Sequence, residues 1–210
     1  MIARTEFHNI SGTRCPTDFV ELPSVLMERF CYAPSVLPLF ARHYITDEPL
    51  SLQLLYRHET DAFRAYAHQQ QIVFSVLDMK YHSQTGPVDS TYIAHEVYRD
   101  YAPLPTISPY SRITPQANFT HLFSYGASYY SYLFDRAIAS KIWKEVFEMD
   151  PLSREAGEKY IQEVLKWGGG RDGWECVAGI LGRDDLRGGG DEAMEHVGEW
   201  GIERQVGGLN

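Results

Sequence analysis

A short acidic stretch near the N-terminus carries the residues best suited to metal chemistry. It runs from Gly12 to Glu28 and reads GTRCPTDFVELPSVLME. Within it Asp18 and Glu21 lie three positions apart, so on a helix their carboxylates share one side. Carboxylate oxygens are among the ligands that zinc accepts in proteins. The pair is therefore a candidate for metal binding, although the same spacing also fits an amphipathic helix with a solvated acidic face.

A second group of residues with chemical potential lies in the stretch NFTHLFSYGASYYSYLFDRAIASKIWKEVFEMD. On one continuous helix, its histidine and three of its tyrosines would fall within about 80° of arc and form a polar aromatic stripe. These residues are His121, Tyr125, Tyr129 and Tyr132. Gly126 and the adjacent serines favour instead a loop that leads into the helix. Either geometry can direct the four side chains into one pocket, and a tyrosine-rich helix interface is the alternative.

Three segments of the chain resemble the thimet oligopeptidase family of zinc metallopeptidases. They read TEFHNISGTRCPTDFVELPSVLMERF, HLFSYGASYYSYLFDRAIASKIW and WKEVFEMDPLSREAGEKYIQEVLKWGGG. The resemblance extends to about Gly182. It implies that Glu21, in the DFVE tetrad, is the third protein ligand of a catalytic zinc, and that Asp18 supports this ligand without binding the metal.

The resemblance also assigns roles to the histidine and tyrosine group. It implies that His121, Tyr129 and Tyr132 are catalytic and stabilise the oxyanion, and that Tyr125, Tyr129 and His121 bind the peptide. The loop that carries Tyr125 is one residue shorter than in thimet oligopeptidase itself. The substrate implied is a peptide or a precursor protein imported into the mitochondrial matrix, from which short N-terminal peptides are removed.

The HExxH motif that supplies the other two zinc ligands in that family is absent from this sequence. None of the eight histidines has another histidine four residues away, so no helix here presents the two imidazoles of a His, His, Glu site. We therefore interpret the chain as the C-terminal portion of a larger enzyme. We expect zinc in the complete enzyme, and we expect this chain alone to be inactive and to hold no zinc. Its expected partner is the missing N-terminal part.

Two interpretations from other functional classes remain open. One is a non-catalytic, all-α module that binds peptides, which the missing HExxH motif favours. The other is a structural helical partner of another subunit.

Composition narrows the classes of partner. The formal net charge of −9 argues against binding to the phosphate backbone of nucleic acid. No apolar stretch approaches the roughly 20 residues needed to span a bilayer, and the N-terminus does not resemble a transit peptide. The three cysteines are too few and too widely spaced for a disulfide framework, and nothing near Cys15 indicates a nucleophile.

The pattern of apolar residues predicts an all-α fold. Helical spacing is clearest over residues 60–81, and further helices are predicted over 89–101, 154–167 and 172–181. Pro23 predicts a bend just past Glu21. A proline-containing loop is expected over 102–115. We expect residues 1–182 to form part of a helical metallopeptidase catalytic domain and the glycine-rich residues 183–210 to form a poorly ordered tail around one short amphipathic turn.

Overall fold

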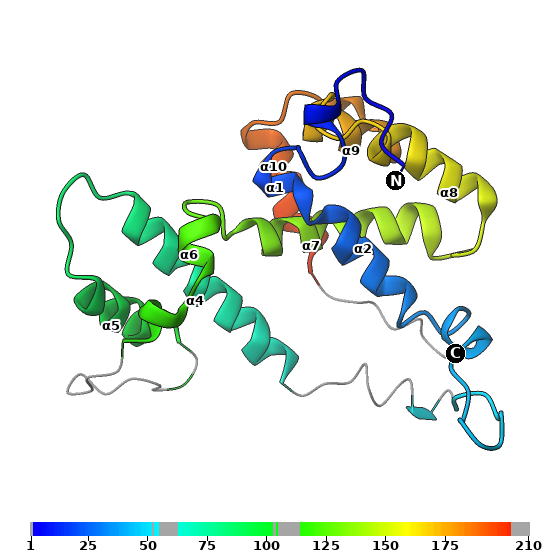
Figure 1. The fold of residues 1–210 in the computed structure, drawn as a ribbon, viewed down its shortest axis with the longest axis horizontal. Coiled ribbons are helices and arrows are strands. Elements are labelled where there is room, and N and C mark those ends of the chain that lie inside the picture. The colour runs from blue at the N-terminus through cyan, green and yellow to red at the C-terminus, as the bar shows by residue number, and fades with distance from the viewer. Residues whose placement is uncertain (1, 52, 55–62, 103, 105–113, 203–210) are drawn as a thin grey trace. The chain divides into compact units, whose positions relative to one another are not determined.

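The computed structural model describes residues 2–51, 53–54, 63–102, 104 and 114–202. In these ranges every regular element is a helix (Figure 1), which confirms the predicted all-α class. Arg42 and Pro49 form an isolated antiparallel bridge. No helix among the described residues is long and apolar enough to cross a membrane. Most of the predicted loop at 102–115 lies outside the described residues.

The chain divides into two compact units. The first comprises Met1–Asp61 and Phe134–Asn210, and the second comprises Ala62–Leu133. Short 3₁₀ turns occupy four places in the described chain, namely His8–Ile10, Leu37–Leu39, Pro115–Asn118 and Asp184–Leu186.

In the first unit a helix is interrupted at Glu21. Helix α1 covers Thr17–Val20 and helix α2 covers Leu22–Phe30, with Glu21 as the single residue between them. Pro23 occupies the second position of α2, where its missing N–H removes no intrahelical hydrogen bond. The backbone of Glu21 therefore lies at a helix junction, two residues before Pro23.

The rest of the first unit is built from helices around one core. Helix α7 (Ser131–Ile142) continues as a π-helix over Trp143–Phe147, and α8 (Arg154–Tyr160) continues as a π-helix over Ile161–Leu165. Helix α9 (Gly173–Leu181) begins at Asp172, whose carboxylate accepts a hydrogen bond from the Trp174 amide at 2.8 Å. The fully buried core side chains include Leu22, Leu26, Ile138, Ile142, Val177, Ile180 and Leu186.

Part of the segment expected to form a poorly ordered tail is helical. Helix α10 covers Asp191–Trp200, and its Ala193 and Val197, four residues apart, are buried on one face. Leu186, just before it, is also fully buried in the core of the first unit. Gly188, Gly189 and Gly190 lie between the buried Leu186 and Ala193. Residues 203–210 lie outside the described part of the chain.

The second unit is organised on a helix pair. Helix α4 (Arg64–His82) and helix α5 (Ser90–Tyr101) lie side by side (Figure 1) and enclose a small core of Val73, Leu77, Ala94 and Val97. The carboxylate of Asp89 begins α5 by accepting hydrogen bonds from the Thr91 and Tyr92 amides, each at 3.0 Å. The short helix α6 (His121–Ser124) follows, and a loop at residues 125–130, here called the tyrosine loop, leads into α7.

Candidate functional site

Glu21 lies at the junction of α1 and α2 with its side chain half-buried. The hydroxyl of Ser24 lies 2.9 Å from Oε2 of Glu21 and 2.8 Å from the Glu21 carbonyl oxygen, so it restrains the carboxylate against its own helix turn. Asp18 lies one turn earlier on α1 and is also half-buried. It lines a pocket of about 250 Å³ together with residues such as Phe134 and Trp174.

Asp135 is a third acidic residue near this junction, and the sequence analysis did not single it out. It is fully buried on α7. Burial, with a smaller contribution from the nearby charges of Asp18 and Glu21, raises the pKa of its carboxyl to about 8, even though the backbone amides of Glu21 and Leu22 act to lower it. Those amides lie close enough to favour the charged form, yet within the described part of the chain neither carboxylate oxygen completes a hydrogen bond of normal geometry. Asp135 is consequently mostly neutral at pH 7.

The donor chemistry at the junction fits one ligand of a zinc site. A carboxylate oxygen of Glu21 is a suitable donor, but a catalytic zinc requires three protein ligands. Among the residues that the structure describes, no group of three or more His, Cys, Asp or Glu side chains is placed to hold a metal ion. A zinc site that used Glu21 would therefore need further ligands from outside the described residues.

In the second unit the structure gathers His121, Tyr125, Tyr129 and Tyr132 into one aromatic cluster. The ring centroid of His121 lies 5.7 Å from that of Tyr125, 5.6 Å from that of Tyr129 and 6.0 Å from that of Tyr132. The Tyr132 ring in turn lies 5.5 Å from Tyr125 and 5.1 Å from Tyr129. These separations are typical of interacting aromatic pairs. All four predicted residues thus lie together, on a helix, loop and helix rather than on one continuous helix.

The aromatic cluster rests on two phenylalanines. Phe119 contacts Tyr129 at 5.0 Å and His121 at 5.4 Å, and Phe74 of α4 contacts Tyr129 at 5.8 Å between ring centroids. Tyr129 is buried, whereas His121, Tyr125 and Tyr132 are each half-buried. The cluster therefore has a buried side formed by Tyr129 and three members that remain partly accessible to a ligand.

Two residues of α4 hold the tyrosine loop, and sequence analysis assigned neither to the site. Asp78 is fully buried, and its two carboxylate oxygens accept hydrogen bonds from the backbone amides of Ala127 and Tyr129. His82 pairs with Asp78 at 2.8 Å. The sequence signal that could have identified Asp78 is its position next to Leu77, where a charged residue lies on the apolar face of the helix predicted over 60–81.

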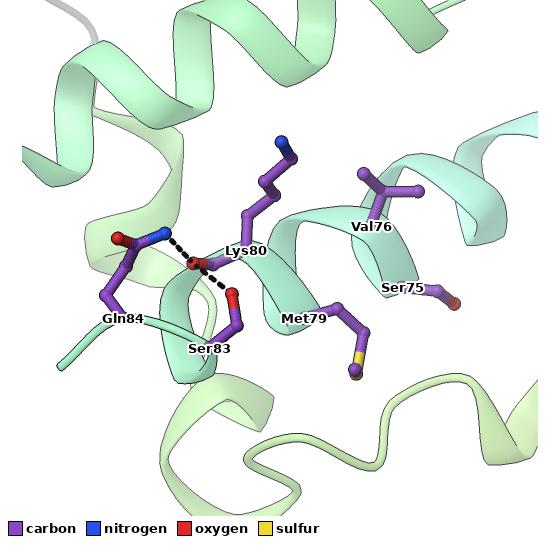
Figure 2. Close-up of a pocket in the computed structure, with 6 residues that line it drawn as sticks. All are labelled: Ser75, Val76, Met79, Lys80, Ser83 and Gln84. Carbon is purple, nitrogen blue, oxygen red and sulfur yellow. Dashed lines mark hydrogen bonds between the residues drawn. The ribbon is translucent and has the colours of Figure 1, made fainter.

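The outer face of α4 carries a separate, shallow pocket of about 410 Å³ (Figure 2). No residue predicted for the site lines it. Two of the lining side chains, Ser83 and Gln84, donate hydrogen bonds to the Lys80 carbonyl oxygen, each at 3.3 Å. The pocket is lined by Ser75, Val76, Met79, Lys80, Ser83 and Gln84.

Comparison with known proteins identifies the family. A family model described as peptidase family M3 matches residues 1–196. The mitochondrial intermediate peptidase of Coccidioides immitis is 50% identical over 220 residues, which cover 96% of this chain and 27% of the relative. Those of Aspergillus clavatus and Malassezia globosa are each 48% identical, over 97% and 96% of this chain and 28% and 25% of the relatives. The chain thus spans about a quarter of the curated relatives that it matches, and the resemblance seen in the sequence is confirmed.

Proposed function

The chain belongs to peptidase family M3, and from this we propose that it contributes one part of the active site of a zinc metalloendopeptidase related to the mitochondrial intermediate peptidases. Its substrates would be oligopeptides or precursor proteins imported into the mitochondrial matrix, from which it removes short N-terminal peptides. The observation that carries this proposal is the aromatic cluster, in which four residues predicted from the sequence lie together.

Glu21 is the residue of this chain that would hold the metal. Its carboxylate is half-buried and restrained by Ser24, so little side-chain freedom remains to be lost on binding. When bound, zinc supplies polarisation of the scissile carbonyl and a bound water of lowered pKa. Asp18 supports the ligand from one turn away. The remaining two ligands and the general base would come from an HExxH segment that this sequence does not contain.

The aromatic cluster would act on the substrate side. The hydroxyls of Tyr129 and Tyr132 and the imidazole of His121 are hydrogen-bond donors, and donors held in place before the reaction stabilise the oxyanion that forms as the carbonyl is attacked. Tyr125, with Tyr129 and His121, would bind the peptide. Because His121 and Tyr132 lie on helices and Tyr129 lies on a loop fixed to α4, these donors would need little rearrangement during the reaction.

A chimera tests the metal assignment. In the Coccidioides immitis peptidase, the matching segment is replaced by this chain, so that the relative supplies the rest of the enzyme. We expect Glu21→Ala in this chimera to lose bound zinc and nearly all peptide hydrolysis, because a required ligand is gone. The matched control is Glu28→Ala, which removes an exposed glutamate of α2 and should retain zinc. A Glu21→Ala chimera with one tightly bound zinc would overturn the ligand assignment.

The absence of HExxH from the sequence favours a second candidate, a peptide-binding module without catalysis. In that case the 210-residue chain alone should bind oligopeptides, and binding should depend on His121 and Tyr125. Isothermal titration with an oligopeptide distinguishes the two candidates, because the proposed peptidase part should bind peptide weakly without the rest of the enzyme.

A further inference from the structure

A buried carboxylate on α4 holds the tyrosine loop. Oδ1 of Asp78 accepts a hydrogen bond from the Ala127 amide at 3.0 Å, and Oδ2 accepts one from the Tyr129 amide at 2.9 Å. The side chain of Asp78 is 1% exposed, so water does not compete for these bonds. A carboxylate is suited to this task because both of its oxygens are acceptors, and bonds to an ionised acceptor are stronger than neutral ones.

His82 completes the arrangement one helical turn further along α4. Its Nδ1 lies 2.8 Å from Oδ1 of Asp78 and 2.9 Å from the Asp78 carbonyl oxygen. Neither oxygen can donate, so Nδ1 must carry the proton and donate to them. The ring therefore has one tautomer when neutral, and its donor restrains the Asp78 carboxylate in the orientation that serves the loop.

The opposite edge of the His82 ring lies against the tyrosine loop. A Cβ atom placed on Gly126 would lie 2.6 Å from Nε2 of His82, closer than carbon and nitrogen can approach without a shift. The next residue, Ala127, has φ of +60°, a left-handed conformation that residues with side chains rarely adopt. The loop thus combines a close approach with an unfavourable backbone conformation, and both occur where Asp78 and His82 contact it.

We propose that Asp78, oriented by His82, is the positioning residue of the aromatic cluster. Its carboxylate fixes the backbone of residues 127–129, and this places the Tyr129 ring against His121 and Tyr132. The effect of Asp78 and His82 on peptide hydrolysis rests on the proposed function. Their effect on the conformation of the tyrosine loop is independent of that function. The two residues act through the backbone and touch no substrate.

Helices α4 and α5 offer two control substitutions that leave the contacts of Asp78 and His82 intact. At about 100° per residue, Lys80 lies roughly 200° around α4 from Asp78, on the face of the shallow pocket in Figure 2. Its side chain is exposed, so Lys80→Ala should not affect the loop. Asp100→Asn makes the same chemical change as Asp78→Asn at an exposed position of α5.

Amide hydrogen exchange in the 210-residue chain tests the proposal directly. In Asp78→Asn one acceptor oxygen becomes an NH₂ group that faces an amide N–H, so one loop bond is lost and a repulsive contact replaces it. We expect exchange at Ala127 and Tyr129 to accelerate by about tenfold or more, while the α5 amides change little. Lys80→Ala and Asp100→Asn should leave both amides unchanged. Unaltered exchange at Ala127 and Tyr129 in a folded Asp78→Asn chain would overturn the proposal.

A second set of variants keeps the proposal testable if Asp78→Asn does not fold. Gly126→Ala should accelerate loop exchange, because its methyl group displaces the His82 ring. His82→Asn retains a donor close to the position of Nδ1 and removes the obstructing edge of the ring. We therefore expect Gly126→Ala to have little further effect in the His82→Asn background. Equal effects of Gly126→Ala in both backgrounds would show that the ring does not position the loop.

Activity of the chimera separates this proposal from the proposed function. Asp78→Asn should lower kcat with full zinc content and a smaller change in KM, and Asp78→Glu, which keeps both acceptors, should recover part of the loss. If Tyr132→Phe lowers kcat but Asp78→Asn affects neither kcat nor loop exchange, the positioning role is wrong and the proposed function stands. If Asp78→Asn loosens the loop while Tyr132→Phe and Tyr129→Phe have full activity, the positioning role stands and the proposed function fails.

Discussion

At the scale of single residues, three buried or half-buried acids are accommodated in three different ways. Asp78 accepts hydrogen bonds from two backbone amides and pairs with an imidazole, and the half-buried Glu21 is restrained by a hydroxyl. Among the described residues Asp135 has no hydrogen-bond partner of normal geometry, and burial raises the pKa of its carboxyl to about 8. The environment of each carboxylate, rather than its residue type, thus decides which acids can serve as charged groups.

The three cysteines should differ strongly in reactivity. Burial raises the pKa of the Cys176 thiol to about 11 and also raises that of Cys15, whereas Cys31 is exposed. The thiolate is the reactive form of cysteine. The raised pKa values keep the partly buried Cys15 thiol and the buried Cys176 thiol protonated at pH 8. We expect iodoacetamide to modify Cys31 first, Cys15 slowly and Cys176 only after denaturation, as measured by mass spectrometry. Rapid modification of Cys15 in the folded chain would revive its candidacy as a nucleophile.

At the scale of helices, the elements that the sequence predicts well are those with local signals. The apolar period over residues 60–81 corresponds to α4, and the starts of α5 and α9 follow from the capping side chains of Asp89 and Asp172. The helix junction at Glu21 lies two residues before Pro23, and the break before α7 follows from Gly126. In each case a few neighbouring residues determine the backbone.

The features that sequence analysis missed depend on contacts between distant residues. The carboxylate of Asp78 binds amides 49 and 51 positions along the chain, and no local pattern reports such a pairing. The burial of Asp135 likewise depends on α1 and α2, far from it in sequence. The grouping of His121 with the tyrosines could be predicted, because these residues lie within one short stretch. The hydrogen bonds from Asp78 of α4 that hold the tyrosine loop could not be predicted from that stretch.

The helical segment after residue 182 is longer than the one short amphipathic turn expected there, and its contribution can be tested by mutation. Leu186 is fully buried, so we expect Leu186→Ala to lower the free energy of unfolding by about 2–5 kcal/mol, the range for truncating a buried leucine. Met194→Ala, at an exposed position of α10, should change it by less than about 0.5 kcal/mol. The measurement is urea unfolding followed by circular dichroism. Equal, negligible effects would support the poorly ordered tail that the sequence predicts.

At the scale of the whole molecule, the chain exposes large apolar side chains close together in sequence. Leu39, Phe40, Tyr44 and Ile45 are 60%, 64%, 89% and 72% exposed within seven residues. Scattered apolar residues are normal on protein surfaces, but a contiguous group favours association with another surface. This chain spans about a quarter of the curated relatives that it matches, so further chain is a candidate to cover this group.

We therefore expect the isolated chain to self-associate and to bind a hydrophobic dye. Replacing Phe40 and Ile45 by serine should reduce both effects, whereas Thr46→Ser, at a neighbouring exposed position, should not. Analytical ultracentrifugation and dye fluorescence provide the measurements. A wild-type chain that stays monomeric, with a sharp and reversible thermal transition, would argue for an autonomous module instead.

The central claim is that the aromatic cluster stabilises the oxyanion, and its most direct test is the kcat of the chimera that carries Tyr132→Phe. The substitution removes one hydroxyl and keeps the ring that packs against His121, Tyr125 and Tyr129. If that hydroxyl donates to the oxyanion, kcat should fall by roughly 10²–10³ while KM and zinc content stay nearly unchanged, because only the transition state loses a hydrogen bond. A Tyr132→Phe chimera with kcat within a few-fold of the parent would contradict the account and would leave the aromatic cluster as a helix interface.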